Sequence, residues 1–188
     1  MKMKLFSVIL VMVWAPVCLS QSVAPGTLEL GGSLGFVSMS DDLYEINGDS
    51  FTSISIQPRA SYFVSQGLGL GLVFDYLKMG YDSGSDVTVF GIGPALTYYF
   101  WPEGQRTAPF IGASYVYQKT TSEGDQTMTT VELTAGVAIA LAEHFALKIG
   151  AFYAMDETEF EADEWGLGNI DISGKRIGVN VGFAGFLF

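Results

Sequence analysis

Six ionisable side chains recur within segments that are otherwise built of apolar residues, glycine and small polar residues. They are Glu29, Arg59, Asp75, Glu132, Lys148 and Arg176. Three are acids and three are bases, and a charge removed from water is costly unless it is paired. The chemistry open to such a set is that of a paired charge network. It would serve either as a gate on an ion path or as a plug that fills an interior.

A second concentration of charge lies near the C-terminus, where seven acids occur among aromatic and aliphatic residues between positions 156 and 175. The candidate contact residues are Asp156, Glu157, Glu159, Glu161, Asp163, Glu164 and Trp165. Carboxylates suit Ca²⁺ or Mg²⁺, which could bridge to phosphate groups, but the spacing does not fit an EF-hand, and no dedicated metal site is predicted. The aromatic residues could instead contact a partner, and a merely solvated acidic loop is a third interpretation.

Enzymatic chemistry finds little support in the chain. The single histidine, His144, lies beside Glu143 in a predicted turn, away from any serine that could complete a catalytic triad. No cysteine and histidine cluster offers a zinc site, and the glycines of 67–71 alternate with leucine as in a strand rather than forming a phosphate-binding loop. We therefore expect no enzyme activity and no cofactor. With 20 acids against 9 bases, we also expect no nucleic-acid partner.

The elements that must position these residues show alternation with a period of two, which is the signature of β-strands. Apolar side chains occupy one parity, and glycine, small polar and the six ionisable residues occupy the other. Eight such segments are predicted, at residues 27–39, 51–64, 68–79, 87–100, 108–118, 129–141, 145–155 and 176–188. Each is long enough to cross a bilayer at a tilt.

Eight amphipathic strands predict an all-β fold: an eight-stranded antiparallel up-and-down transmembrane β-barrel. Connections after the second, fourth and sixth strands are shorter than most of the others, and the largest predicted loop is 156–175. An uninterrupted apolar face favours contact with lipid over a soluble barrel, in which that face would turn inward. An aromatic girdle is predicted from Tyr98, Tyr99, Phe100 and Trp101, with Phe63 and Phe145 at the same level.

The predicted strand pairing also gives the charges specific partners. If the first two strands pair symmetrically about residues 44–45, Glu29 lies opposite Arg59. If the next two pair about residues 66–67, Arg59 lies near Asp75. We therefore predict a Glu29–Arg59–Asp75 triad inside a formally neutral lumen.

The N-terminal segment predicts export of the chain. Lys2 and Lys4 precede an apolar run from Leu5 to Ala15, which is too short to span a bilayer, and small residues follow up to Ser20. We interpret residues 1–20 as a signal peptide and residues 21–188 as the barrel domain. Cleavage there would remove Cys18, so disulfides are not expected.

Three segments and the chain end resemble the small outer-membrane β-barrel proteins of the OmpA-like and OmpX-like porin family. They are FGIGPALTYYF at 90–100, PFIGASYVYQ at 109–118, LAEHFALKIGAFY at 141–153, and the ending GVNVGFAGFLF. The resemblance implies a location in the outer membrane of a Gram-negative-type cell. It also implies a terminal aromatic residue that the barrel-assembly machinery recognises. Phe186 and Phe188 have inward parity, so an outward Phe188 would need a bulge near Gly185.

Together these features predict a non-enzymatic outer-membrane protein, a monomer, that contributes to envelope integrity or surface interaction through acidic extracellular loops. Its expected partners are outer-membrane lipid, lipopolysaccharide and an unidentified surface ligand. The alternative is a narrow porin-like channel for ions or small hydrophobic solutes. The two hypotheses differ over the lumen, which a paired charge network would close and an unpaired one would leave wet.

Overall fold

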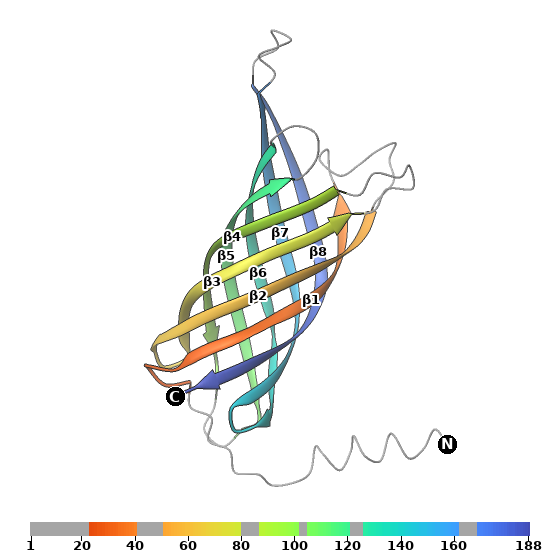
Figure 1. The fold of residues 1–188 in the computed structure, drawn as a ribbon. Helices are drawn as coiled ribbons and strands as arrows, with labels where there is room; N and C mark the ends of the chain where they lie inside the picture. Colours follow the sequence, from red (N-terminus) through yellow and green to blue (C-terminus); the bar gives the residue numbers. More distant parts are fainter. Residues whose placement is uncertain (1–22, 41–50, 80–86, 102–104, 121–125, 162–168) are drawn as a thin grey trace, which may run out of the picture.

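The computed structural model describes residues 23–40, 51–79, 87–101, 105–120, 126–161 and 169–188, and these residues form a closed barrel of eight antiparallel strands (Figure 1). The strands are β1 (Leu28–Ser40), β2 (Phe51–Ser65), β3 (Leu68–Met79), β4 (Val87–Tyr99), β5 (Thr107–Thr120), β6 (Gln126–Ala142), β7 (Phe145–Glu161) and β8 (Asn169–Leu187). The predicted fold class is thus confirmed, and most strand ends lie within a few residues of the predicted ones. No helix among the described residues is long and apolar enough to cross a membrane.

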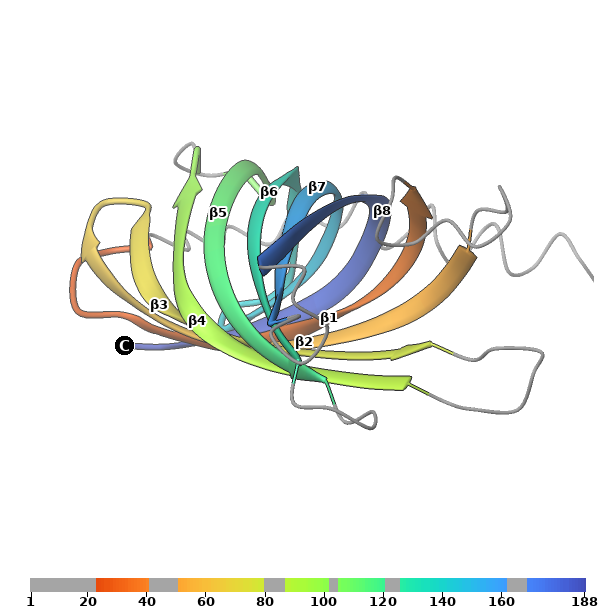
Figure 2. The ribbon, with the colours of Figure 1, turned by 90° about the horizontal axis from the view of Figure 1, so that it is seen from above.

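Each strand pairs with its neighbours in the chain, and β1 closes the barrel against β8. Turned by 90°, the strands curve in succession around a common interior (Figure 2). Stepping from each residue to its partner on the next strand leads from Leu28 through Tyr62, Leu70, Leu96, Ala113, Leu133, Tyr153 and Ile177 to Ser38. One circuit therefore ends ten residues further along β1, a stagger that goes with strands tilted by about 40°.

The end that holds the start of β1 and the C-terminus is called the lower end here, and the opposite end the upper end (Figure 1). Two-residue turns at Gln66–Gly67 and Glu143–His144 join β2 to β3 and β6 to β7 at the lower end. Gly67 has a φ of +73°, and a Cβ there would come within 2.4 Å of the Tyr99 carbonyl oxygen. This turn therefore needs glycine for both its conformation and its space.

Apolar side chains cover the outside of the barrel as a continuous belt. From Phe145 to Met155 on β7, and from Leu187 back to Ile177 on β8, most outward side chains are large, apolar and exposed, with small residues at Ala151 and Gly185. Ten residues at a rise of about 3.3 Å, tilted by about 40°, span roughly 25 Å, which is the height of the apolar band of outer-membrane barrels. The belt therefore has the dimensions of a bilayer core.

Strands β7 and β8 are longer than the sequence predicts. The acidic segment was predicted to form a loop over 156–175, but pairing continues from Asp156 and Gly174 up to Glu161 and Asn169. The loop prediction was wrong because it took the end of the apolar pattern as the end of the strand. Carboxylates can continue a strand: Asp156 points into the lumen and Glu157 points to solvent. Asp163, Glu164 and Trp165 lie outside the described residues, as do residues 1–22.

No bulge reorients the end of β8. Its pairing with β1 runs without a shift of register to Leu187, and its pairing with β7 does so to Gly185. Phe186 is buried inside the barrel, Leu187 faces outward, and Phe188 follows the strand as an exposed residue with its ring 5.1 Å from that of His144. The terminal phenylalanine is therefore exposed because the strand has ended, and the bulge considered near Gly185 is not present.

Candidate functional site

The lumen of the barrel gathers the ionisable residues. All six of the alternating charged residues turn inward, and Asp156 joins them as a seventh. Because the strands are tilted, these residues fall into two sets at different heights. Glu29, Arg59 and Lys148 lie toward the lower end, whereas Asp75, Glu132, Asp156 and Arg176 lie toward the upper end.

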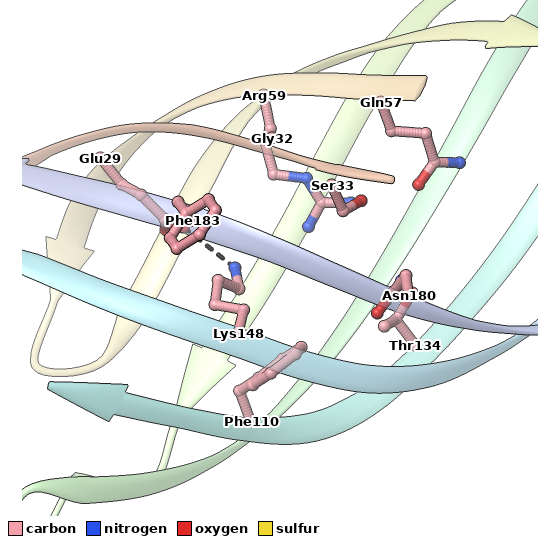
Figure 3. Close-up of a pocket in the computed structure, with 10 residues that line it drawn as sticks. All are labelled: Glu29, Gly32, Ser33, Gln57, Arg59, Phe110, Thr134, Lys148, Asn180 and Phe183. Atoms are coloured by element: carbon pink, nitrogen blue, oxygen red, sulfur yellow. Dashed lines mark hydrogen bonds and ion pairs between the residues drawn. The ribbon is translucent and has the colours of Figure 1, made fainter. Parts of the chain in front are cut away.

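The lower set is centred on an ion pair that crosses the interior. Lys148 Nζ lies 3.0 Å from Glu29 Oε1 (Figure 3). The hydroxyl of Tyr99 donates a hydrogen bond of 2.8 Å to the same oxygen. The ammonium group also lies 5.0 Å from the ring centre of Tyr99 and 4.8 Å from that of Phe110. Lys148 therefore gains cation–π contacts in addition to its charge partner.

Four inward aromatic rings form an aromatic seal below this ion pair: Phe63, Tyr99, Phe110 and Phe186. Tyr99 packs against the other three with ring centres 5.7 to 6.3 Å apart. Trp101 packs against the seal from the end of β4, and small alanines on β5 to β8 fill the space around it. These rings close the lower end with apolar surface, which excludes water without needing any charge to be paired.

Arg59 lies just above the lower ion pair. Its Nη1 donates a hydrogen bond of 2.9 Å to Thr97 Oγ1, and its guanidinium group points into the same pocket as Lys148 (Figure 3). This pocket has a volume of about 30 Å³ and is lined by Gln57, Thr134 and Asn180 on its upper side. It offers polar partners and room for a water molecule, but for little more.

The upper network consists of Asp75, Gln118, Thr130, Asp156 and Arg176. Arg176 binds Asp156 through two hydrogen bonds, from Nε at 2.8 Å and from Nη2 at 2.9 Å, and its Nη1 lies 3.6 Å from Asp75 Oδ2. Thr130 donates to Asp156, and Gln118 donates to Asp75 at 2.7 Å. All five side chains are buried. A guanidinium fork holding a carboxylate in this way is a geometrically specific pair.

Acids exceed bases at the upper level. Besides Asp75 and Asp156, Glu132 lies nearby and accepts a hydrogen bond of 2.9 Å from Gln57 Nε2, while Arg176 is the only base among the described inward residues at this height. The lumen was predicted to be neutral, but Asp156 gives its described residues four acids against three bases. Four buried oxygens also have no hydrogen-bond partner among the described residues: Glu29 Oε2, Ser61 Oγ, Asp75 Oδ1 and Gln118 Oε1.

The predicted Glu29–Arg59–Asp75 triad does not form. Glu29 pairs across the backbone with Ser61, and Arg59 lies opposite Gly31 and Val73, so both predicted registers were displaced by two residues. A slip of two preserves which face a side chain occupies but changes its neighbours. Glu29 therefore meets Lys148 of β7, and Asp75 meets Arg176 of β8, across the interior.

Several residues that shape the lumen were assigned elsewhere or left without a role. Phe63 and Tyr99 were predicted to form part of the lipid-facing girdle, yet they are buried in the aromatic seal, whereas Phe100 and Phe145 do face outward. Tyr99 shares its parity with inward Thr97, which is the signal that could have placed it. Gln57 and Gln118 had inward parity but no predicted partner.

The acids that the structure describes are not arranged as a metal centre. Among the described residues, no group of three or more histidine, cysteine, aspartate or glutamate side chains is placed to hold a metal ion. His144 is exposed in the turn between β6 and β7, and its carbonyl oxygen accepts a hydrogen bond from the Phe186 amide. The side chains of Glu159 and Glu161 lie outside the described set, so the cation-bridging hypothesis for this segment stays a prediction.

Residues 6–184 match the family model described as outer membrane protein beta-barrel domain. No curated protein matches the sequence of this chain.

Three solved structures share the fold at low sequence identity. Neisserial surface protein A is 17% identical, with a TM-score of 0.64 over 85% of this chain and 98% of its own. Outer membrane protein OprG from Pseudomonas aeruginosa is 15% identical, with a TM-score of 0.52 over 87% and 96%. Outer membrane protein AlkL is 13% identical, with a TM-score of 0.50 over 87% and 91%. At these identities the similarity concerns the fold alone.

Proposed function

We propose a function from one premise: the chain belongs to the outer membrane protein beta-barrel domain family. It is a non-enzymatic barrel of the outer membrane whose lumen is closed, and which acts through its outer surface in envelope integrity or surface interaction. The observation that carries this proposal is the double closure of the lumen, by the aromatic seal at one end and the upper network at the other.

The orientation of the barrel follows from its connections. Outer-membrane barrels have short periplasmic turns and longer extracellular loops. The lower end has two two-residue turns and the connection 100–106, and the connections at the upper end span residues 41–50, 80–86, 121–125 and 162–168, which are longer on average. The proposed arrangement therefore exposes the upper end to the medium and the lower end to the periplasm, after removal of a signal peptide at residues 1–20.

The proposal predicts that the barrel does not conduct. The full chain would be refolded into planar bilayers and its conductance compared with that of three variants. Phe63→Ala with Phe186→Ala opens the seal, Asp156→Ala with Arg176→Ala removes the central pair of the upper network, and a fourfold variant combines them. We expect a silent wild type, near silence in each double variant, and openings in the fourfold variant.

The matched control is Phe145→Ala with Phe183→Ala, which removes two outward rings that stack 5.4 Å apart and should leave the lumen closed. A change in gel mobility on heating reports that each variant has folded. Frequent, well-defined openings of the wild type would overturn the closed-lumen proposal. Silence of the folded fourfold variant would show that other side chains close the lumen and would remove the role assigned to these two layers.

The second candidate function is a narrow path for ions or small solutes. It is favoured by the polar pocket of about 30 Å³ between the two closures and by the four buried oxygens without described partners, which occur from Glu29 and Ser61 up to Asp75 and Gln118. Such oxygens could accept hydrogen bonds from a single row of water molecules or coordinate a small cation. The same conductance measurement on the wild type distinguishes this function from the closed barrel.

A further inference from the structure

Three lysines face outward at one height on different sides of the barrel. Lys78 lies on β3, Lys119 on β5 and Lys175 on β8, and all three side chains are exposed. Backbone pairing leads from Lys175 through Met155 and Val131 to Tyr115, four residues below Lys119 on β5. The stagger amounts to ten residues over eight strands, so three strand steps account for almost all of these four residues. Lys119 and Lys175 therefore lie at almost the same height. We name Lys78, Lys119 and Lys175 the lysine ring.

The same reasoning places Lys78 in the ring. Lys119 pairs with Phe90, and Phe90 pairs with Tyr76, two residues below Lys78 on β3. Two strand steps of the same stagger account for these two residues, so Lys78 lies at about the height of Lys119. The alignment of the three lysines is invisible in the sequence, where they lie 41 and 56 residues apart.

The lysine ring marks the upper boundary of the apolar belt. Below it the last outward side chains are large and apolar, such as Phe90 and Met155, and above it come Thr88 and Glu157. Among the described residues the other bases face the lumen, apart from Arg106 in the connection at the lower end. A chain with a net charge of −11 thus places every described outward lysine at the outer boundary of the belt.

A polar hollow lies between two members of the ring. It has a volume of about 420 Å³ and lies on the upper part of β5 to β8. Its lining residues are Tyr117, Thr127, Thr129, Glu157, Thr158, Ile172 and Ser173. Lys119 pairs with Thr127 on one side of the hollow, and Lys175 lies two residues from Ser173 on the other. The outward hydroxyls of Thr127, Thr129 and Ser173 therefore lie between two cationic side chains, whereas Thr158 is buried.

We propose that Lys119, Lys175 and this hollow bind the phosphorylated sugar headgroup of an outer-leaflet glycolipid, with Lys78 contacting a phosphate of a neighbouring headgroup. The ammonium groups bind the phosphates, while their aliphatic stems lie against the apolar belt. The hydroxyls of the hollow and the Glu157 carboxylate bind the sugar hydroxyls. This inference rests on the proposed orientation of the barrel, since it needs the upper end of the belt to face the outer leaflet.

The chemistry suits a lipid better than a soluble anion. A free phosphate would have to approach an acidic protein through water, where exposed charges are screened and weakly attractive. A membrane-anchored headgroup is already held at the height of the lysine ring, so a few charge-assisted contacts suffice to retain it. The lipid thus contributes anchorage that a free anion lacks.

The test measures binding of phosphorylated lipid A to the full chain refolded in phosphatidylethanolamine vesicles, with fluorescent lipid A as the probe. Lys119→Gln with Lys175→Gln should weaken binding at least about tenfold, the size expected for loss of one charge-assisted hydrogen bond. Lys119→Arg with Lys175→Arg keeps both charges and should retain binding within about twofold, as should Arg106→Gln at the lower end.

Two further arms identify the ligand. Dephosphorylated lipid A should bind wild type about as weakly as phosphorylated lipid A binds the glutamine variant, and inorganic phosphate should compete only poorly. Unchanged binding by the folded glutamine variant would overturn the site, and phosphate competing as well as lipid A would overturn the glycolipid assignment. Conductance plays no part in this readout, so a conducting wild type would contradict the closed lumen while leaving the lysine site standing.

Discussion

The two halves of the lumen are closed by different physical means. The lower half is closed by apolar rings, with a single ion pair held against Tyr99 and Phe110. The upper half is closed by charge, with Arg176 shared between Asp156 and Asp75. Loss of one ring leaves a cavity. Loss of the shared cation leaves two buried carboxylates without the positive charge of Arg176, with Thr130 and Gln118 as neutral donors. The upper half should therefore be the more fragile to single substitutions.

The difference also concerns charge balance. Near the lower end one acid faces two bases, and near the upper end three acids face one base among the described inward residues. Arg176 is thus the residue on which the upper half depends most, while Glu29 keeps Tyr99 as a hydrogen-bond donor even when Lys148 is replaced. Three experiments test this comparison, in order of expected effect.

Arg176→Met should have the largest effect on stability. It removes the cation that binds Asp156 and lies 3.6 Å from Asp75, and breaking a buried pair from one side costs about 3 to 5 kcal/mol. Urea unfolding in lipid vesicles measures the loss, and Lys119→Met, an exposed lysine outside the lumen, should change stability by less than about 1 kcal/mol. A loss below about 1 kcal/mol for Arg176→Met would contradict the central role of this residue.

Phe186→Ala should destabilise the lower half by about 3 kcal/mol, because it leaves a cavity beneath Tyr99 and Phe63. Phe183→Ala on the same strand removes a ring that faces outward, where lipid can fill the space, and should cost clearly less. The same unfolding assay compares the two. Equal losses would mean that the seal is not packed as a core.

The smallest effects come from a matched pair of threonines. Thr130→Val removes a hydroxyl that donates to Asp156, and Thr97→Val removes one that accepts from Arg59. Because Asp156 is fully buried while Arg59 lines a pocket with room for a water molecule, we expect about 2 kcal/mol for Thr130→Val and about 1 kcal/mol for Thr97→Val. A larger loss for Thr97→Val would reverse the order of fragility between the halves.

The sequence determined a large part of this fold. Alternation of side chains placed Leu30, Ile149 and Val181 outside and Glu29 and Lys148 inside, because successive residues of a strand face opposite sides. Parity would also have placed Tyr99 in the interior, but the prediction assigned it to the girdle from its position between Tyr98 and Phe100. Facing is therefore a local property, which the chain specifies residue by residue.

Only the tertiary structure decided which inward residues meet. A displacement of two residues keeps every side chain on its face, so alternation could not distinguish Ser61 from Arg59 as the partner of Glu29. The contacts between Glu29 and Lys148, and between Asp75 and Arg176, depend on the ten-residue stagger and on the narrow interior that closure creates. The stagger likewise brings the lysine ring to one height. These are properties of the closed barrel as a whole, which the pattern within any single strand does not contain.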